Sequence, residues 1–571
     1  MKAAAGSAQS AAQVQPRGAE GDTLQGVLLG HALTRPNTVF LRILAEEAPQ
    51  DLTFAQAWSL AQRWALHFRQ HGARPGDVVH IGFPNGSDFV GAFFGALLAD
   101  CVPAPMMPRR NAASEFFNAY VADRLALSGR GMAALPEADA GDAEALAFKP
   151  VTPRGLPQRL GGGLEAADFG DPGRTALLQY TSGTSGRSKA VALSHAALLF
   201  QAAAITEVLG LDAEIDHAVS WLPFYHDMGL IGFLLTPLLL GGRVALLTTE
   251  QVMIRPSVWM DAVSRQRATI TGGPPSAYVM AARFARSRRT TSLDLSCLRV
   301  ALIGAERITR PALEMIESGF ETSGLSAAAL TPAYGMAEVG LAVTISPPGD
   351  GASFMTISRE HMRQNARAVT DVRAPLDCGE PVVTCGRPVP GVEVKILSGG
   401  RAASENEIGD IVVRSPSVMS GYRGLDSRLP NPVKDGWYST GDRGFLSNGA
   451  LYFTARAGEI LVVGGANYLP EEYEEVARAA IERPVHRAVA FACDNVQSGS
   501  ESVVVLVENE RTTPEDRSAL AARIRTDLTE RRLPVGRVVV VPPRTIKLTG
   551  NGKLPRARLK ARYLEGEFGH A

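Results

Sequence analysis

Hydroxyls, glycines and cations are concentrated in one ten-residue stretch, Thr181 to Ala190, which reads Thr-Ser-Gly-Thr-Ser-Gly-Arg-Ser-Lys-Ala. Glycines let a backbone turn tightly and bring its N–H groups to an anion, while hydroxyls and cations add hydrogen bonds and charge. The stretch is therefore a candidate phosphate-binding loop. Its spacing is not that of a P-loop, because Ser188 precedes Lys189 and Ala190 follows it. Taken alone, a loop of this composition is more often a flexible turn.

The length and charge of the chain limit its class. Its 571 residues exceed the ~250 to 300 at which one hydrophobic core stops growing, so we expect two or more domains. The 58 basic and 58 acidic residues cancel, which gives no reason to expect nucleic acid or an anionic membrane as a partner. Five scattered cysteines without metal-site spacing suit a reducing cytoplasm. We expect a soluble, cytoplasmic protein.

The sequence predicts no targeting or membrane-spanning segment. Residues 1–21 are rich in Ala, Gln and Gly, lack the apolar segment of a secretory signal, and are expected to form a disordered leader. The most hydrophobic stretch, Gly229 to Leu247, is interrupted by Pro237 and Arg243 and by two glycines. Its apolar runs are thus shorter than the ~20 residues that span a bilayer. We therefore expect no membrane insertion.

Helical and strand patterns alternate along the chain, which favours an α/β fold. Residues 54–70 carry apolar side chains at helical spacing, and residues 299–303 are a short apolar run beside a glycine, typical of a buried parallel strand. Strands rich in Val and Ile alternate with Gly and Pro turns from about residue 382 to 413, indicating a β-rich subdomain. Beyond Pro470 helix and strand patterns alternate again. We expect a large N-terminal domain of several subdomains at 22–455, with its β-rich part at 383–455, and a small α/β C-terminal domain at 456–571.

Four further motifs follow the hydroxyl-rich loop. They are Ile303-Gly-Ala-Glu306, Tyr334-Gly-Met-Ala-Glu338, Tyr438-Ser-Thr-Gly-Asp442 and Thr549-Gly-Asn-Gly-Lys553-Leu-Pro-Arg556. Together, the five motifs resemble those of the adenylate-forming superfamily of acyl-CoA synthetases, peptide-synthetase adenylation domains and luciferases. Each motif alone is weak, but five in the expected order make accidental resemblance improbable. The superfamily's architecture implies that the small C-terminal domain is mobile.

A second group of residues resembles the fatty acyl-AMP ligase branch of that superfamily. It comprises Leu222-Pro-Phe-Tyr-His-Asp-Met-Gly-Leu-Ile231, Arg255-Pro-Ser-Val-Trp259, Thr271-Gly-Gly-Pro274 and Thr384-Cys-Gly-Arg-Pro388. The branch carries an inserted segment, here residues 346–382, associated with making acyl-AMP without transfer to coenzyme A. The resemblance implies that ATP and Mg²⁺ activate a fatty acid, and that the acyl group then passes to the phosphopantetheine of an acyl carrier protein.

Such a reaction brings two anions together, the carboxylate and the α-phosphate of ATP, so positioning and cations should supply most of the catalysis. Lys553 is the expected catalytic cation, because its long side chain follows a glycine turn. Without the resemblance we would interpret it as a solvated lysine of a basic tail. Glu338 is the expected Mg²⁺ ligand, since Mg²⁺ prefers oxygen donors. The alternative for Glu338 is a carboxylate facing a helix N-terminus.

The resemblance also implies a nucleotide site. Tyr334 is expected to stack on adenine and Asp442 to hold the ribose hydroxyls, with Arg456 donating to ribose or phosphate. A tyrosine at a strand end is otherwise more often plain core. The implied ATP- and AMP-binding residues are Thr181, Ser182, Gly183, Thr184, Ser185, Gly186, Lys189, Gly304, Ala305, Glu306, Tyr334, Gly335, Met336, Ala337, Asp442 and Arg456.

His226 is the second expected catalytic residue, placed by the resemblance beside the acyl carboxylate or at the gate of its pocket. The alternative is a hydrogen-bonded core histidine. The segment that follows it, together with Trp259, is a candidate wall of the acyl pocket, although buried helices have the same pattern. The predicted pocket residues are Tyr225, Met228, Gly229, Ile231 and Tyr278.

One motif departs from the superfamily pattern. Gly-Arg-x-Lys-Asp, at the hinge before the small domain, is here Ala455-Arg-Ala-Gly-Glu459. Gly458 deletes a charged side chain and frees the backbone, so we expect a looser hinge. Two other functions stay open, an acyl-CoA synthetase and a non-catalytic acyl- or nucleotide-binding relative. Retention of Lys553, Glu338 and Asp442 argues against the second.

Overall fold

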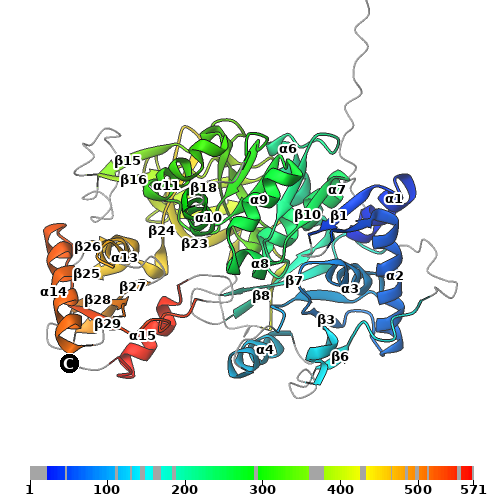
Figure 1. The fold of residues 1–571 in the computed structure, drawn as a ribbon, viewed down its shortest axis with the longest axis horizontal. Helices are drawn as coiled ribbons and strands as arrows, with labels where there is room; N and C mark the ends of the chain where they lie inside the picture. The colour runs from blue at the N-terminus through cyan, green and yellow to red at the C-terminus, as the bar shows by residue number, and fades with distance from the viewer. Residues whose placement is uncertain are drawn as a thin grey trace, which may run out of the picture.

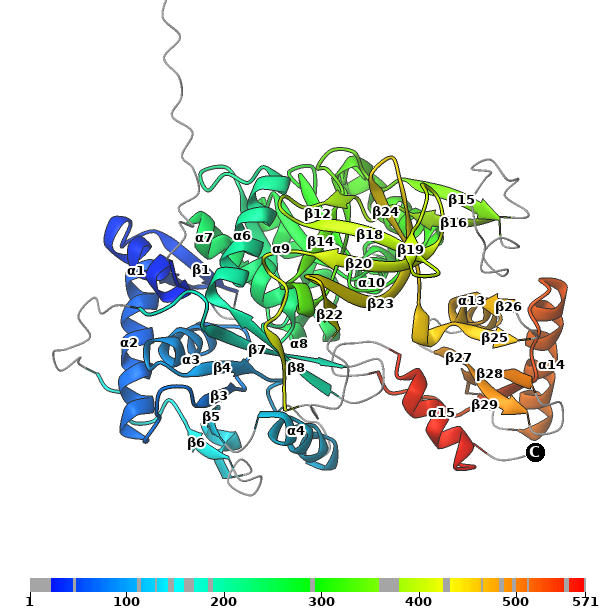
Figure 2. The same ribbon diagram turned by 180° about the vertical axis from the view of Figure 1, so that it is seen from behind.

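The computed structural model shows two bodies. The larger runs from α1 (Leu24–Thr34) to β24 (Ala450–Arg456), and the smaller from β25 (Leu461–Val463) to α15 (Arg556–Leu564) (Figure 1, Figure 2). Both contain helices and strands, which confirms the predicted α/β class with a large N-terminal and a small C-terminal part. The residues that the structure describes are 22–44, 48–109, 114–128, 131–141, 148–158, 169–182, 188–287, 293–358, 379–424, 432–463, 466–481, 487–495, 500–510, 513–548 and 554–568. The predicted leader, 1–21, lies outside them.

Among the described residues, a nine-stranded sheet organises the larger body. Its central strands are parallel, and antiparallel strands flank them at both edges. In order across the sheet the strands are β17 (Arg387–Pro388), β14 (Ala342–Ile345), β13 (Leu330–Gly335), β12 (Val300–Ile303), β11 (Ile270–Gly273), β9 (His217–Ser220), β10 (Arg243–Leu246), β1 (Val39–Ile43) and β2 (Gln50–Thr53).

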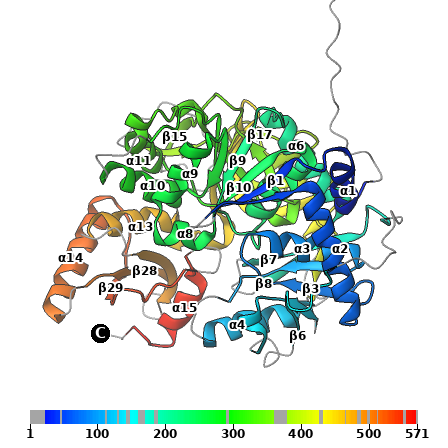
Figure 3. The same ribbon diagram turned by 45° about the vertical axis from the view of Figure 1, so that its right-hand side comes forward.

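Helices connect the successive parallel strands, because the chain must return to the same end of the sheet before the next strand begins. Figure 3 shows three of them, α9, α10 and α11, side by side. The helices along this part of the chain are α6 (His195–Leu209), the π-helix η2 (Met228–Leu235), α7 (Thr236–Leu240), α8 (Thr249–Ile254), α9 (Ser257–Gln266), α10 (Pro275–Ser287) and α11 (Arg310–Phe320), with the short turns η3 (Glu321–Ser323), η4 (Ala327–Ala329) and η5 (Ala337–Val339).

A smaller parallel sheet lies nearer the N-terminus. Its helices α2 (Phe54–Gln70) and α3 (Ser87–Leu98) pack closely, since a Cβ on Gly95 would lie only 2.4 Å from Cβ of Trp64. A capping box at Thr53 and Gln56 starts α2 at the predicted residue. The remaining elements are β4 (Val102–Pro105), β3 (Val78–Ile81), β5 (Met132–Ala134) and β6 (Lys149–Val151), in sheet order, with α4 (Ser114–Ser128) and η1 (Glu137–Asp139).

Strands dominate the chain after the large sheet and form the β-rich subdomain. Its six-stranded sheet has the order β19 (Arg401–Ala402), β18 (Glu393–Ser398), β20 (Gly409–Arg414), β23 (Trp437–Ser447) and β22 (Val433–Lys434), with β24 also on β23. β24 reaches Arg456, one residue beyond the predicted boundary. A separate three-stranded sheet has the order β21 (Gly421–Arg423), β8 (Ser188–Ser194) and β7 (Thr175–Ser182).

The described ends of the predicted insertion form a hairpin. β15 (Phe354–Ser358) pairs antiparallel with β16 (Gly379–Val383), and residues 359–378 between them lie outside the described residues. Ile357 and Val382 are buried against Ile408 and Phe445 of the β-rich subdomain. The hairpin base is therefore packed on the larger body, near α11 in Figure 1.

The C-terminal body has its own apolar clusters. One lies under α13 (Pro470–Ala479) and α14 (Pro514–Glu530), and another under α15. Its remaining elements are β26 (Ala466–Tyr468), β27 (Ala488–Asn495), β28 (Ser500–Glu508) and β29 (Arg537–Val541), and the turn η6 (Ala457–Glu459) links the two bodies. Across the described parts of both bodies, no helix has the length and apolar character needed to cross a bilayer.

A buried histidine supports the strand that leads into the hydroxyl-rich loop. His80 Nδ1 lies 3.3 Å from the carbonyl of Met132, and Nε2 lies 3.0 Å from Tyr180 Oη and 2.9 Å from Ser128 Oγ. The carbonyl can only accept, so the neutral ring carries its proton on Nδ1. Burial lowers the pKa of His80 to about 4.

We predict that His80 makes the large body less stable in acid. Below about pH 6.5 the unfolded chain binds a proton at this residue while the folded chain resists until about pH 4, so stability falls across that window by about 3 kcal/mol. His80→Gln should flatten this part of the pH dependence of thermal unfolding. Tyr180→Phe, which keeps the buried ring, should retain it. An unchanged slope in His80→Gln would contradict the assignment.

Candidate active site

The predicted phosphate loop connects β7 to β8. Thr181 and Lys189 pair across these antiparallel strands at the base of the loop, whereas Gly183, Thr184, Ser185 and Gly186 lie outside the described residues, and the side chain of Ser182 is not described either. The Thr181 hydroxyl is buried and has no hydrogen-bond partner within the described part of the chain. A buried hydroxyl of this kind is suited to bind a ligand oxygen.

Tyr334 and Asp442 join the large sheet to the β-rich subdomain. Tyr334, at the end of β13, donates its hydroxyl hydrogen bond to Asp442 Oδ2 at 2.7 Å. Arg456, paired with Asp442 across β23 and β24, places Nε 3.4 Å from Oδ1. The Tyr334 ring stacks with Phe453, with centroids 5.9 Å apart. Burial and the Asp442 carboxylate raise the pKa of Tyr334, so its hydroxyl stays protonated and able to donate.

Glu338 lies in the turn η5, just beyond β13. Its Oε1 accepts a hydrogen bond from Tyr422 Oη at 3.0 Å, and its carbonyl accepts one from the Met419 amide at 2.8 Å. Lys189 Nζ lies 3.4 Å from the same Tyr422 hydroxyl. The structure thus brings together two predicted site residues, Glu338 and Lys189, through a third that the sequence did not single out.

At the ends of β12 and β13 the backbone lies very close to the backbone of a neighbouring segment. A Cβ on Gly304 would lie 2.8 Å from the carbonyl oxygen of Ala333, and one on Gly335 would lie 1.8 Å from that of Leu341. Only glycine fits either position. Ala305 has a φ of 64°, in the left-handed region.

The neighbours of these glycines already have structural partners. Glu306 accepts hydrogen bonds from the amide and hydroxyl of Ser276, at 3.2 and 3.0 Å. The Met336 amide donates to the Leu341 carbonyl at 2.8 Å, and Ala337 is buried. The predicted nucleotide-binding segments therefore meet at the carboxyl ends of adjacent parallel strands, where ligands bind in open α/β sheets.

Two buried amides hold the turn that carries His226. Asn85 donates to the carbonyl of Leu222 at 2.8 Å and accepts from the amide of Phe224 at 3.0 Å. Gln179, on β7, donates to the carbonyl of Tyr225 at 2.8 Å. Neither amide belongs to a recognisable motif, so no sequence pattern marks them as functional. The turn is thereby tied to the strand that leads into the phosphate loop.

His226 itself is oriented by its neighbour. Its Nδ1 lies 2.5 Å from Asp227 Oδ1, which also accepts the Met228 amide at 2.8 Å and so caps η2. Because the carboxylate binds Nδ1, it fixes the ring with a proton on that nitrogen. The side chain is 18% exposed, which places it at the boundary between core and surface.

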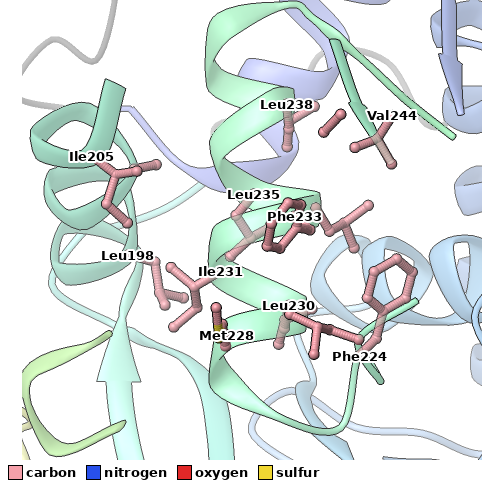
Figure 4. Packing of buried hydrophobic residues seen from close by; sticks show 14 of the residues in the cluster. Leu198, Ile205, Phe224, Met228, Leu230, Ile231, Phe233, Leu235, Leu238 and Val244 are labelled. Carbon is pink, nitrogen blue, oxygen red and sulfur yellow. The ribbon is translucent and has the colours of Figure 1, made fainter. Parts of the chain in front are cut away.

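Two of the predicted acyl-pocket residues, Met228 and Ile231, lie among the buried apolar side chains around η2 (Figure 4). Met228 and Ile231 are buried and lie near Leu198 of α6 in Figure 4. Gly229 is required by packing, because a Cβ there would be 2.3 Å from the carbonyl oxygen of Pro223. π-Helical turns are rare in proteins, and those that do occur are often at functional sites.

Tyr278 is fully buried and packs on Trp259, with ring centroids 4.6 Å apart. Its hydroxyl donates to the carbonyl of Leu302 at 3.2 Å, and burial raises its pKa. The Trp259 indole donates to Thr271 Oγ1 at 2.8 Å. Both aromatic residues have the surroundings of core, and their role in an acyl pocket remains a prediction.

The hinge and the C-terminal motif are only partly described. Lys553 lies outside the described residues. Arg556, which closes its motif, binds Glu459, Glu471 and Glu474 at 2.6 to 2.9 Å. Gly458 precedes Glu459, and a Cβ there would meet no atom within 4 Å. Packing does not demand glycine at 458, so its effect on the hinge stays a prediction.

Glu306 and Glu338 follow the carboxyl ends of the parallel strands β12 and β13, and Lys189 shares the Tyr422 hydroxyl with Glu338, an arrangement that suits an α/β enzyme that binds a nucleotide. The AMP-binding enzyme family matches residues 30–423, and the chain belongs to this family. A Caulobacter vibrioides protein provisionally named an acyl-CoA synthetase is 32% identical over 553 residues, which cover 95% of each chain. The medium-chain-fatty-acid acyl-carrier-protein ligase JamA of Moorena producens is 29% identical, and the match covers 85% of each chain.

Solved structures agree with this family. A fatty acyl-adenylate ligase, from work on the E. coli and L. pneumophila enzymes, superposes with a TM-score of 0.84 at 27% identity, covering 95% of this chain and 98% of that one. The resemblance to the adenylate-forming superfamily is thus confirmed, as is the prediction of an ATP-using enzyme that forms acyl-AMP.

We predict that Asp442→Asn weakens ATP use selectively. The change removes the charge that faces Arg456 and would accept from the ribose hydroxyls, so KM for ATP should rise roughly tenfold, the scale of a hydrogen bond to a charged group. KM for the carboxylic acid should change little. Asp410→Asn, on the neighbouring strand β20 and largely exposed, is the matched control. Equal effects of Asp442→Asn on both KM values would contradict the assignment.

Proposed function

We propose that this chain activates a fatty acid with Mg-ATP and transfers the acyl group to the phosphopantetheine thiol of an acyl carrier protein. A carboxylate oxygen attacks the α-phosphorus of ATP, the bond to the bridging oxygen breaks, and pyrophosphate leaves. The thiol sulfur then attacks the acyl carbon, AMP leaves, and the thiol proton passes to solvent. The observation that carries the proposal is that Tyr334 and Arg456 both contact the Asp442 carboxylate, while Glu338 and Lys189 meet on the Tyr422 hydroxyl.

The chain's residues have distinct tasks in this scheme. Asp442 and Arg456 hold the ribose, and the ends of β12 and β13 border the adenine. Thr181 and Lys189 donate to phosphate oxygens from the base of their loop. His226, held by Asp227 just before the apolar η2, orients the carboxylate. Lys553 supplies positive charge to the α-phosphate, where negative charge builds up.

A magnesium ion fits the donor set around Glu338. Mg²⁺ that arrives with ATP takes most of its ligands from phosphate and water and needs only one or two carboxylates. Within the described residues no group of three or more His, Cys, Asp or Glu gathers as in an all-protein metal site. Glu338 would hold the ion, which would neutralise charge on the phosphates.

An acyl-CoA synthetase is the second candidate, because the Caulobacter relative carries that name. The JamA name and the packed hairpin at the base of the insertion favour a carrier protein as the acceptor. Both candidates share the acyl-AMP step and differ only in the thiol that accepts the acyl group.

We predict that the acceptor separates the two candidates. With ATP and a panel of medium- to long-chain fatty acids, a phosphopantetheinylated carrier protein should become acylated, while free coenzyme A should give little thioester. Intact-protein and small-molecule mass spectrometry measure the two products. Abundant acyl-CoA would overturn the proposed acceptor while leaving the acyl-AMP step in place.

The same assay tests the proposed catalytic lysine. Lys553→Ala should lose acyl-AMP formation, and Lys547→Ala, an exposed lysine of the same C-terminal segment, should retain it. Equal activity of the two variants would contradict the role of Lys553.

A further inference from the structure

One phenol connects the proposed metal ligand to the phosphate-loop lysine. Tyr422 donates its hydroxyl hydrogen bond to Glu338 Oε1 at 3.0 Å and accepts one from Lys189 Nζ at 3.4 Å. The ammonium also lies 4.6 Å from the centroid of the Tyr422 ring. A phenol can donate and accept at the same time. Lys189, Tyr422 and Glu338 therefore form a polar chain that runs from a cation to an anion.

The backbone fixes Tyr422 relative to both charged residues. Its strand β21 pairs antiparallel with β8, the strand of Lys189, with Tyr422 opposite Val191. Just before β21, the Met419 amide binds the carbonyl of Glu338 at 2.8 Å. The hydroxyl is thus placed by main-chain hydrogen bonds to the two segments that it joins.

The hydroxyl keeps its proton. Burial, together with the nearby Glu338 carboxylate, raises the pKa of Tyr422. Tyr438 Oη, itself buried, lies 3.4 Å away and completes the surroundings of the group. The phenol is therefore a donor to Glu338 throughout the neutral pH range.

The arrangement holds opposite charges near each other without direct contact. In the part of the chain that the structure describes, Lys189 and Glu338 form no ion pair, and the phenol stands between them. Removal of the hydroxyl would let the ammonium and carboxylate attract each other directly. A direct pair would occupy the carboxylate that a metal needs and the cation that a phosphate needs.

We propose that Tyr422 is a positioning residue that keeps Glu338 available to the metal and Lys189 available to the phosphates of Mg-ATP. The inference rests on the proposed function only in taking Mg-ATP as the ligand of these two residues. It adds a residue that acts through Glu338 and Lys189 before any fatty acid is bound.

The test is binding of α,β-methylene-ATP without fatty acid, measured by calorimetry over a range of Mg²⁺ concentrations. Tyr422→Phe should weaken binding roughly tenfold and raise the Mg²⁺ concentration needed for half-maximal binding, on the scale of one hydrogen bond to a charged group. Tyr452→Phe, which removes a hydroxyl from β24 near Thr384, is the matched control and should bind as the original chain does. Affinity of Tyr422→Phe within about twofold of the original would overturn the proposal.

A double-mutant cycle separates positioning from a general structural effect. In a Glu338→Gln background, Tyr422→Phe should cost much less affinity, because the hydroxyl acts through the carboxylate. An undiminished loss there would overturn the proposal. If Tyr422→Phe shows no thermal unfolding transition, the cycle uses Lys189→Met and Glu338→Gln, singly and together. Strictly additive losses of nucleotide affinity in these variants would overturn the proposal. The binding test contains no acyl acceptor. A chain that binds Mg-ATP but makes no acyl thioester would therefore refute the proposed function and leave the inference about Tyr422 intact.

Discussion

The hydrogen bond from Tyr334 to Asp442 is the constraint on which the rest of the site depends. It joins the carboxyl end of a central parallel strand to a hairpin of the β-rich subdomain, 108 residues further along the chain. Asp442 is buried, and a buried carboxylate is costly unless hydrogen bonds satisfy it. Tyr334 and Arg456 provide that compensation, and in doing so they fix where the two parts of the larger body meet.

Most of the fold could be predicted, because each element has a local signal. The helix expected over residues 54–70 is α2, and the strand expected over 299–303 is β12 with one residue fewer. Glycine-flanked motifs were also recognisable, since only glycine allows the approach of Ala333 to Gly304 and of Leu341 to Gly335. The family followed from the order of such motifs.

The contacts between segments could not be predicted in the same way. Tyr422 binds Glu338 from 84 residues away, and Asn85 holds the Leu222 carbonyl across 137 residues. A single polar residue in a turn gives no sign of a partner so distant. The π-helical form of η2 was hidden as well, because an apolar run has the same composition in any helix. Tertiary packing determines these long-range contacts and the form of η2, whereas the periodicity of a sequence indicates only local secondary structure.

All the proposed residue roles depend on one chemical step, the attack of a fatty carboxylate on the α-phosphorus of ATP. The direct measurement uses a fatty acid labelled with ¹⁸O in both carboxylate oxygens, unlabelled ATP and a carrier-protein acceptor, with the AMP analysed by mass spectrometry. One labelled oxygen should appear in each AMP released, because the attacking oxygen stays on phosphorus when the acyl group leaves. AMP free of label, or formation of ADP in its place, would contradict the claim.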